Sequence, residues 1–254
     1  MDNLGKEMPN YSNWVARRLI TVPGAICLLF FGLSFVFLPL VVVAVFFLAI
    51  AAYFAYARYL FSRAGGDVQA KVQDLVLDNL DWSGKGSALD IGCGNAPLTI
   101  KLARKYPEAK VTGIDYWGDM WEYSKGICEG NAEIEGVAQR VSFQKASAAA
   151  LPFEDGFFDA AVSNLVFHEV SAARDKKELI REALRVVKKG GRFVFQDLFF
   201  WKSVYGDPDE LVAAIRSWGV SRVELIETRN AAFIPAAVKL PFMVGTLGIL
   251  RGEK

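Results

Sequence analysis

The feature that most constrains this chain is a run of 39 uncharged residues, from Leu19 to Ala57, of which 33 are apolar. A single helix of that length would measure roughly 58 Å, about twice the thickness of the hydrocarbon core of a bilayer. Pro39 lies near the middle of the run, and proline inside a helix removes a hydrogen bond and breaks or kinks the chain. The run therefore predicts two short helices, 19–37 and 40–58, that form a hairpin.

Basic residues flank the apolar run on both sides: Arg17 and Arg18 precede it, and Arg58 and Arg63 follow it. Positive charge collects on the cytoplasmic side of membrane segments, so these flanks predict that both ends of the hairpin lie in the cytoplasm. A hairpin that crosses the bilayer twice and a re-entrant hairpin that never reaches the far side both satisfy this pattern. We therefore expect a membrane protein whose globular domain is cytoplasmic.

Two other interpretations of the apolar run are disfavoured. Residues 49–51, Ala-Ile-Ala, resemble a signal-peptide cleavage site, but the apolar stretch before them far exceeds the roughly 7–15 residues of a signal-peptide core. A hairpin buried in a soluble core is disfavoured because no polar positions alternate with the apolar ones. The expected segments are an amphipathic, interfacial stretch at 1–18, the helical hairpin at 19–63 and a globular domain at 64–254.

The globular domain has an ordinary charge balance. Residues 64–254 contain 24 basic and 26 acidic residues, a net charge of −2. A slightly acidic domain without a dense basic stripe lacks the electrostatic signature of nucleic-acid binding, so no nucleic-acid partner is expected. The three cysteines, Cys27, Cys93 and Cys128, are odd in number and widely spaced, which indicates neither a disulfide framework nor a metal site. The sequence does not predict an oligomeric state.

Strand and helix patterns alternate through the globular domain. This alternation predicts an α/β fold with a doubly wound, Rossmann-like sheet of seven strands, mostly parallel. The last strand is expected to be antiparallel because no helical pattern precedes it. The expected strands are 87–91, 110–115, 140–145, 158–165, 192–198, 222–227 and 245–251. The expected helices are 67–80, 97–105, 117–134, 176–187 and 207–218.

The most informative stretch, residues 88–97, reads Ala-Leu-Asp-Ile-Gly-Cys-Gly-Asn-Ala-Pro. It is a strand that enters a glycine turn and then a helix, and glycines there allow a ligand to approach the backbone. A dinucleotide site would have a third glycine where Pro97 stands, which disfavours a nicotinamide-dependent oxidoreductase. Asp115 ends the next strand, where a carboxylate can accept hydrogen bonds from ribose hydroxyls. The pattern indicates an adenosine-containing ligand without a pyrophosphate.

These motifs resemble those of class I S-adenosylmethionine-dependent methyltransferases over about residues 67–254. Residues 90–94 are similar to the first motif of the family, and residues 113–115 are similar to the second. Leu-Pro-Phe at 151–153, followed by Phe-Asp at 158–159, resembles the ubiquinone/menaquinone-methyltransferase-like branch. Residues 186–191 resemble the usual lead into the fifth strand. The resemblance implies methyl transfer with S-adenosylmethionine as the cofactor.

The resemblance also implies a set of cofactor-binding residues. The methionine part is expected over the glycine turn with Asp90 near its ammonium group, while Asp115 holds the ribose. Ser147 stands where many relatives carry an acidic residue that binds the adenine amine. For the two aspartates the alternative is simple solvation at strand ends. The expected cofactor-binding residues are Asp90, Gly92, Cys93, Gly94, Asp115, Tyr116, Ser147, Ala148 and Asn164.

His168 is the single histidine of the chain and the candidate catalytic residue. It follows the fourth strand, where this fold places a substrate-facing loop, and a group that titrates near neutrality suits a general base. The alternative is a histidine that caps the loop or orders Glu169. Asn164 does not begin the Asn-Pro-Pro-Tyr motif of many enzymes that methylate nucleobase or glutamine amines, which disfavours such substrates.

Two segments near the expected site are unusually apolar, residues 197–205 and 233–243. They are expected either to admit a hydrophobic acceptor or to pack against the sheet or the hairpin. Together with the hairpin, they predict a membrane-anchored methyltransferase that acts on a small apolar or amphiphilic acceptor, such as a lipid, a quinone-type ring or a hydrophobic thiol. A catalytically inactive binding or scaffold protein at the membrane is the alternative.

Overall fold

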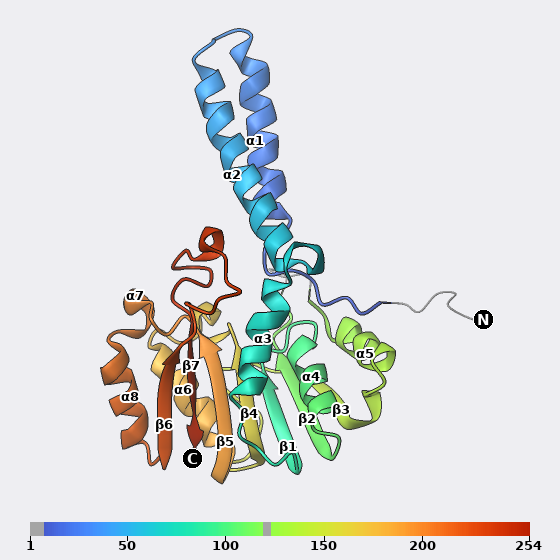
Figure 1. The fold of residues 1–254 in the computed structure, drawn as a ribbon, viewed down its shortest axis with the longest axis vertical. Helices are drawn as coiled ribbons and strands as arrows, with labels where there is room; N and C mark the ends of the chain where they lie inside the picture. The colour runs from blue at the N-terminus through green and yellow to red at the C-terminus, as the bar shows by residue number, and fades with distance from the viewer. Residues whose placement is uncertain (1–7, 119–122) are drawn as a thin grey trace, which may run out of the picture. The chain divides into compact units, whose positions relative to one another are not determined.

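The computed structural model describes residues 8–118 and 123–254, which form two compact units (Figure 1). One unit is Asn13–Lys71. The other unit runs from Val72 to Lys254 and includes the amino-terminal residues up to Ser12. The first unit is a helical hairpin, and the second contains the sheet.

The hairpin consists of α1 (Arg18–Ser34) and α2 (Leu40–Phe61), which lie side by side (Figure 1). The break expected at Pro39 is present, because this residue immediately precedes the first residue of α2. Small side chains let paired helices approach closely, and Ala44 and Ala51, seven residues apart on α2, are buried. Among the described helices, α2 alone is long and apolar enough to cross a membrane by length and composition.

The two ends of the hairpin are held together by hydrogen bonds. The Asn13 side-chain amide donates to the backbone carbonyl of Arg58 over 3.0 Å. The Arg58 guanidinium in turn donates to the carbonyl of Val15. The Trp14 and Phe61 rings pack with their centroids 5.6 Å apart. The chain therefore enters and leaves this unit at the same end of the hairpin, and a short helical turn, η1 (Arg63–Gly65), follows it.

The second unit is built on a seven-stranded sheet in the order β3-β2-β1-β4-β5-β7-β6. All strand pairs are parallel except those of β7, which runs antiparallel to both β5 and β6. The expected antiparallel last strand is therefore confirmed. The strands are β1 (Gly86–Ile91), β2 (Ala109–Asp115), β3 (Val141–Lys145), β4 (Phe158–Asn164), β5 (Val187–Asp197), β6 (Arg222–Glu227) and β7 (Gly248–Glu253).

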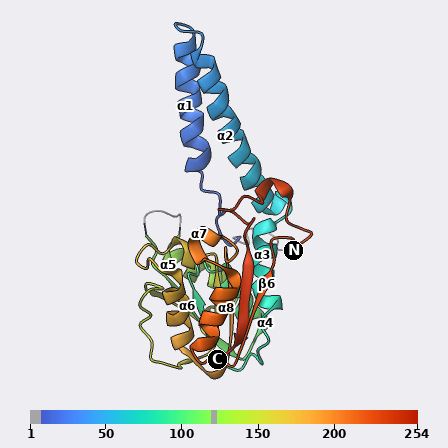
Figure 2. The same ribbon diagram turned by 90° about the vertical axis from the view of Figure 1, so that its left-hand side faces the viewer.

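Helices cover both faces of the sheet (Figure 2). One face packs against α3 (Val68–Asp78), α4 (Pro97–Lys105) and α5 (Lys125–Ile134) through buried aliphatic side chains. The other face packs against α6 (Lys176–Arg185) and α8 (Pro208–Ser217) through a cluster rich in phenylalanine. The remaining helical segments are α7 (Lys202–Tyr205), η2 (Ala138–Arg140), η3 (Phe167–Glu169) and η4 (Ala236–Val238).

The helix expected over 117–134 is wrong in its first part. Trp117 has a φ of 43°, a left-handed conformation that a right-handed helix excludes. The helix begins only at Lys125, where the Ser124 hydroxyl caps it by accepting a hydrogen bond from the Ile127 amide over 3.2 Å. Residues 119–122 of the expected helix lie outside the described residues.

Candidate active site

The glycine turn after β1 is held close to the end of β2. The amides of Gly92 and Cys93 both donate to the carbonyl of Ile114, over 2.8 and 2.9 Å. Gly92 has a φ of 73°, and a Cβ added there would lie 2.2 Å from the Val166 side chain. A larger residue at this position is therefore excluded by both conformation and space. The turn brings its backbone to the carboxyl edge of the sheet, where doubly wound folds bind ligands.

Asp115 connects the end of β2 to this turn. One carboxylate oxygen accepts a hydrogen bond from the Gly94 amide at 2.9 Å, and the other accepts one from the Trp117 amide at 2.8 Å. The Trp117 indole donates back to the Gly94 carbonyl over 3.0 Å. Burial raises the pKa of Asp115, and these amides oppose that rise. Each carboxylate oxygen retains a lone pair that a ribose hydroxyl could use.

Asp90 is a buried carboxyl one residue before the end of β1, with 1% of its surface exposed. Its oxygen Oδ2 accepts a hydrogen bond from the hydroxyl of Thr99, on α4, over 2.6 Å. Burial is the main cause that raises the pKa of Asp90 to about 7, and the negative charge of Asp115 adds to the rise. Its charge therefore changes near neutral pH, so a cation that binds beside it would favour the ionised form.

Three asparagines, which we call the asparagine clamp (Asn10, Asn95 and Asn131), hold the outer side of the glycine turn. The Asn131 side-chain amide donates to the carbonyls of Asn95 and Asn10 over 2.9 and 3.0 Å, and its oxygen accepts from the Asn10 amide over 2.8 Å. The Asn95 side chain donates to the Ser12 hydroxyl over 3.0 Å. Sequence reasoning did not identify Asn10 or Asn131 because both lie far from the motif in the chain.

The residues expected near adenine gather at the same edge of the sheet. The amide of Ala146 donates to the Asp115 carbonyl over 3.0 Å, which places Ser147 and Ala148 just beyond the end of β2. The Ser147 hydroxyl accepts a hydrogen bond from the Ala149 amide over 3.2 Å. Tyr116 is 65% exposed, and the Nζ atom of Lys145 lies 5.1 Å from the centroid of its ring.

The cysteine of the turn has a packing role. Cys93 and Cys128 are both buried, and the Cys128 thiol donates to the Gly94 carbonyl over 3.1 Å. Burial and a hydrogen bond with Cys128 raise the pKa of the Cys93 thiol. The Cys93 thiol therefore stays uncharged at neutral pH.

His168, on η3, is paired with Asp197, the last residue of β5. The His168 Nδ1 lies 2.6 Å from Oδ1 of Asp197, whose side chain is fully buried. The amides of Val166 and His168 donate to Oδ2 of Asp197 over 3.2 and 3.3 Å, and the Leu198 amide donates to Oδ1 over 2.6 Å. Sequence reasoning considered only Glu169 as a partner, although the carboxyl ends of the parallel strands β4 and β5 lie side by side.

The pKa values of this pair move apart. Burial alone would raise the pKa of Asp197, but the charge and hydrogen bond of His168, with the backbone amides, outweigh it and lower the pKa. Burial alone would lower the pKa of His168, but Asp197, with help from Glu169, outweighs it and raises the pKa.

The remaining expected residue, Asn164 at the end of β4, has a buried amide oxygen without a hydrogen-bond partner.

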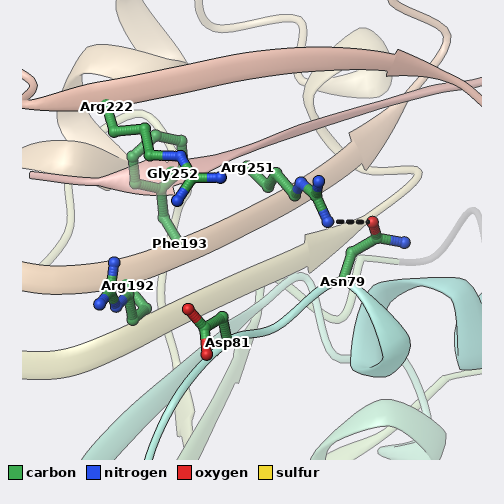
Figure 3. A pocket seen from close by; sticks show the side chains of 7 residues that line it. All are labelled: Asn79, Asp81, Arg192, Phe193, Arg222, Arg251 and Gly252. Atoms are coloured by element: carbon green, nitrogen blue, oxygen red, sulfur yellow. Dashed lines mark hydrogen bonds between the residues drawn. The ribbon is translucent and has the colours of Figure 1, made fainter.

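A cavity of about 260 Å³ lies elsewhere, toward the amino ends of β5 and β6 (Figure 3). Arginine side chains from three neighbouring strands line it. Arg251 donates to the Asn79 side chain over 2.9 Å and pairs with Glu224 at 2.9 Å, and Arg192 pairs with Glu253. It contains none of the expected site residues, and its ion pairs neutralise much of its charge.

Comparison with known proteins identifies the class of enzyme. A family model described as a methyltransferase domain matches residues 89–195, which include the glycine turn, Asp115 and His168. A ubiquinone/menaquinone biosynthesis C-methyltransferase from Desulfotalea psychrophila is 29% identical over 197 residues, 67% of this chain and 74% of that protein. The chain is an S-adenosylmethionine-dependent methyltransferase, and S-adenosylmethionine is its cofactor. The inactive scaffold is therefore set aside.

Two further proteins are similar to this chain over part of its length. Ajmaline N-methyltransferase from Rauvolfia serpentina is 30% identical over 106 residues, 42% of this chain but only 34% of that protein. A crystal structure of geranyl diphosphate C-methyltransferase from Streptomyces coelicolor A3(2), with S-adenosyl-L-homocysteine bound, superposes with a TM-score of 0.56 at 14% identity. That match covers 74% of this chain and 79% of the other. The second comparison shows a shared fold.

Asp90 predicts a pH dependence of cofactor binding. The cofactor's α-ammonium group stays protonated below about pH 7, so of these two groups only the aspartate titrates there. From its pKa of about 7, the ionised fraction rises roughly fivefold between pH 6 and pH 7, and we expect the affinity for S-adenosylmethionine to rise with it. Titration calorimetry at several pH values measures this, with Asp90→Asn as the control. An equal pH dependence in that variant would contradict the assignment.

The asparagine clamp predicts a second effect on cofactor binding. Asn131→Ala removes three hydrogen bonds and leaves buried groups unpaired, which costs about 1–3 kcal/mol. Because one of these bonds holds the glycine turn, we expect roughly tenfold weaker binding of S-adenosylmethionine together with a lower Tm. Asn230→Ala is the control, since this exposed asparagine bonds only to Glu227. A lower Tm with unchanged affinity would show that the clamp stabilises the fold alone.

Proposed function

We propose that this enzyme is membrane-associated and that it methylates a small apolar or amphiphilic acceptor, such as a lipid or a quinone-type ring. The observation that carries the proposal is the apolar hairpin α1–α2, joined in one chain to a methyltransferase domain. The names of two similar proteins support it. One is a ubiquinone/menaquinone biosynthesis enzyme, and the other acts on geranyl diphosphate.

The hairpin is apolar on all sides. No residue of α1 is buried, and large side chains such as Leu28, Phe35 and Val36 are 73%, 82% and 90% exposed. A helix that is hydrophobic all round requires an apolar environment, and exposed apolar surface of this kind marks a membrane or a protein partner. The surface of the hairpin therefore supports insertion into a bilayer.

The dimensions and charges of the hairpin support a cytoplasmic domain. At about 1.5 Å per residue, α1 and α2 measure roughly 26 and 33 Å, close to the hydrocarbon thickness of a bilayer. The chain enters and leaves at the same end, next to Arg17, Arg18 and Arg58. Basic residues favour the cytoplasmic side, where S-adenosylmethionine is expected.

In the proposed mechanism, the site acts mainly by aligning the acceptor with the methyl group of the cofactor. When bound, S-adenosylmethionine supplies a sulfonium methyl group. Asp90, Asp115 and the glycine turn would hold it. They fit this role because the Asp115 carboxylate accepts a hydrogen bond from the Gly94 amide of the turn, and Asp90 is a buried carboxyl near the end of the preceding strand. The site has only to align the acceptor and exclude water.

The apolar segments near the site differ in their environments. In residues 197–205, Phe199 and Tyr205 are buried, with ring centroids 4.9 Å apart, so this part packs in the core. In residues 233–243, Phe242 is 53% exposed, whereas Ile234 and Val238 are buried. Phe242 is therefore the better candidate for contact with an acceptor or with lipid.

Charged substitutions on the exposed face of α2 test the proposal. Val45 and Leu48 are 58% and 55% exposed, and an aspartate in the middle of a membrane helix costs about 3 kcal/mol. We expect the double variant Val45→Asp, Leu48→Asp to lose at least about tenfold of its co-flotation with phospholipid vesicles. Methyl transfer to vesicle-borne lipid extract should fall with it.

The matched control is Val45→Leu, Leu48→Val, which keeps the face apolar. Affinity for S-adenosylmethionine should be equal in all three proteins, which shows that the methyltransferase domain is intact. Flotation of the aspartate variant at the level of the control, or equal turnover of lipid extract, would overturn the proposal.

A further inference from the structure

The two ring nitrogens of His168 have different surroundings. Nδ1 lies 2.6 Å from Oδ1 of Asp197. Nε2 lies 3.8 Å from Oε1 of Glu169, beyond hydrogen-bond distance. The His168 side chain is 16% exposed. Nδ1 is therefore bonded within the protein, whereas Nε2 has no hydrogen bond to Glu169.

Asp197 fixes which nitrogen carries the proton. Three backbone amides donate to its carboxylate, from Val166, His168 and Leu198, and they favour its ionised form. An ionised carboxylate only accepts hydrogen bonds, so the neutral His168 ring must carry its proton on Nδ1. Its lone pair then lies on Nε2, the nitrogen that does not face Asp197.

From this geometry we propose that His168 is the general base of the reaction, that Asp197 is its positioning residue, and that the acceptor presents a phenol-type hydroxyl. The inference rests on the proposed function and narrows its acceptor class. A hydroxyl with an acidity near that of tyrosine, with a pKa of about 10, is un-ionised at neutral pH. Such an acceptor becomes a strong nucleophile only when a base removes its proton.

The step balances without another reactant. The acceptor O–H proton passes to Nε2 of His168, and the electron pair left on the acceptor forms the bond to the methyl carbon while the C–S bond leaves its pair on sulfur. Transfer at oxygen completes the reaction. Transfer at a conjugated ring carbon requires one more loss of a proton, from that carbon to solvent.

The groups around His168 and Asp197 suit a base that takes up a proton and later releases it. The imidazolium formed is stabilised by Asp197 and Glu169, and it is opposed by Lys176 and by burial. Tyr205 is buried, and both burial and the charge of Asp197 raise the pKa of its hydroxyl. The Tyr205 hydroxyl therefore stays protonated at neutral pH and does not take up the proton that the acceptor releases.

Because the chain has one histidine, nuclear magnetic resonance can test the pair without any acceptor. Protein labelled with ¹⁵N-histidine and purified without a histidine tag gives one pair of ring-nitrogen signals. We expect the neutral ring to be protonated on Nδ1, with a pKa above 6.5. Asp197→Asn should lower the pKa of His168 by at least about one unit. In that variant the neutral ring should no longer be held in the Nδ1-protonated form.

Glu169→Gln is the matched control, because it removes a carboxylate beside the ring but leaves Nδ1 bonded to Asp197. It should keep the Nδ1-protonated tautomer. Binding of S-adenosylmethionine should be unchanged in both variants, which shows that each is folded. A ring protonated on Nε2 in the unmodified protein, or an Asp197→Asn variant with the same tautomer and pKa, would overturn the inference.

Acceptors that differ in the acidity of their hydroxyl group test whether His168 is the general base. The probes are alkylphenols in phospholipid vesicles, one set weakly acidic and one set acidic enough to be ionised at the assay pH. We expect His168→Gln to lose about 10²–10⁴-fold in kcat/KM for the weakly acidic phenols and little for the ionised ones. Equal losses for both sets would overturn the role of the base.

The same assay separates this inference from the proposed function. If the unmodified enzyme methylates lipid extract but no phenol, the phenol-type acceptor is wrong and the proposed function stands. If it methylates no apolar acceptor at all, both are wrong.

Discussion

The hydrogen bond from the Gly94 amide to the Asp115 carboxylate is the interaction on which the site depends. It joins the turn after β1 to the end of β2, and the Trp117 amide and indole reinforce the same joint. Both elements end at the carboxyl edge of the sheet, so one carboxylate fixes the turn and still offers lone pairs to a ligand. This dual use explains why an acidic residue at the end of the second strand suits a nucleoside-binding enzyme.

The two fully buried aspartates show how environment assigns different tasks to the same side chain. Asp90 accepts hydrogen bonds from the hydroxyl and the backbone of Thr99, but burial outweighs them and raises its pKa to about 7, so Asp90 gains by meeting a cation. Asp197 faces an imidazole and three amides, so its pKa is lowered and it stays charged. Groups whose pKa values are pushed apart in this way are typical of the acid and base positions of enzymes.

The sequence predicted what is local and missed what is assembled from distant segments. The sheet, its antiparallel strand and the glycine turn follow from hydrophobic patterns and from one ten-residue motif. Asp197 and Asn131 lie 29 and 36 residues from the groups they bind, and only the fold brings them there. The helix expected from Trp117 failed for a local reason, because the Asp115 carboxylate holds the Trp117 amide in a turn. Whether the expected cofactor residues bind as proposed stays a prediction.

The two thiols packed against the glycine turn have a consequence for measurement. Cys93 and Cys128 are 4% and 0% exposed, and one donates to the Gly94 carbonyl, so a thiol reagent reaches them only when the turn opens. The rate at which the two thiols are labelled therefore measures how often the turn opens, and this measurement needs no catalytic assay. Cys27, which lies in α1 and is partly exposed, reports separately on whether the hairpin is shielded by lipid.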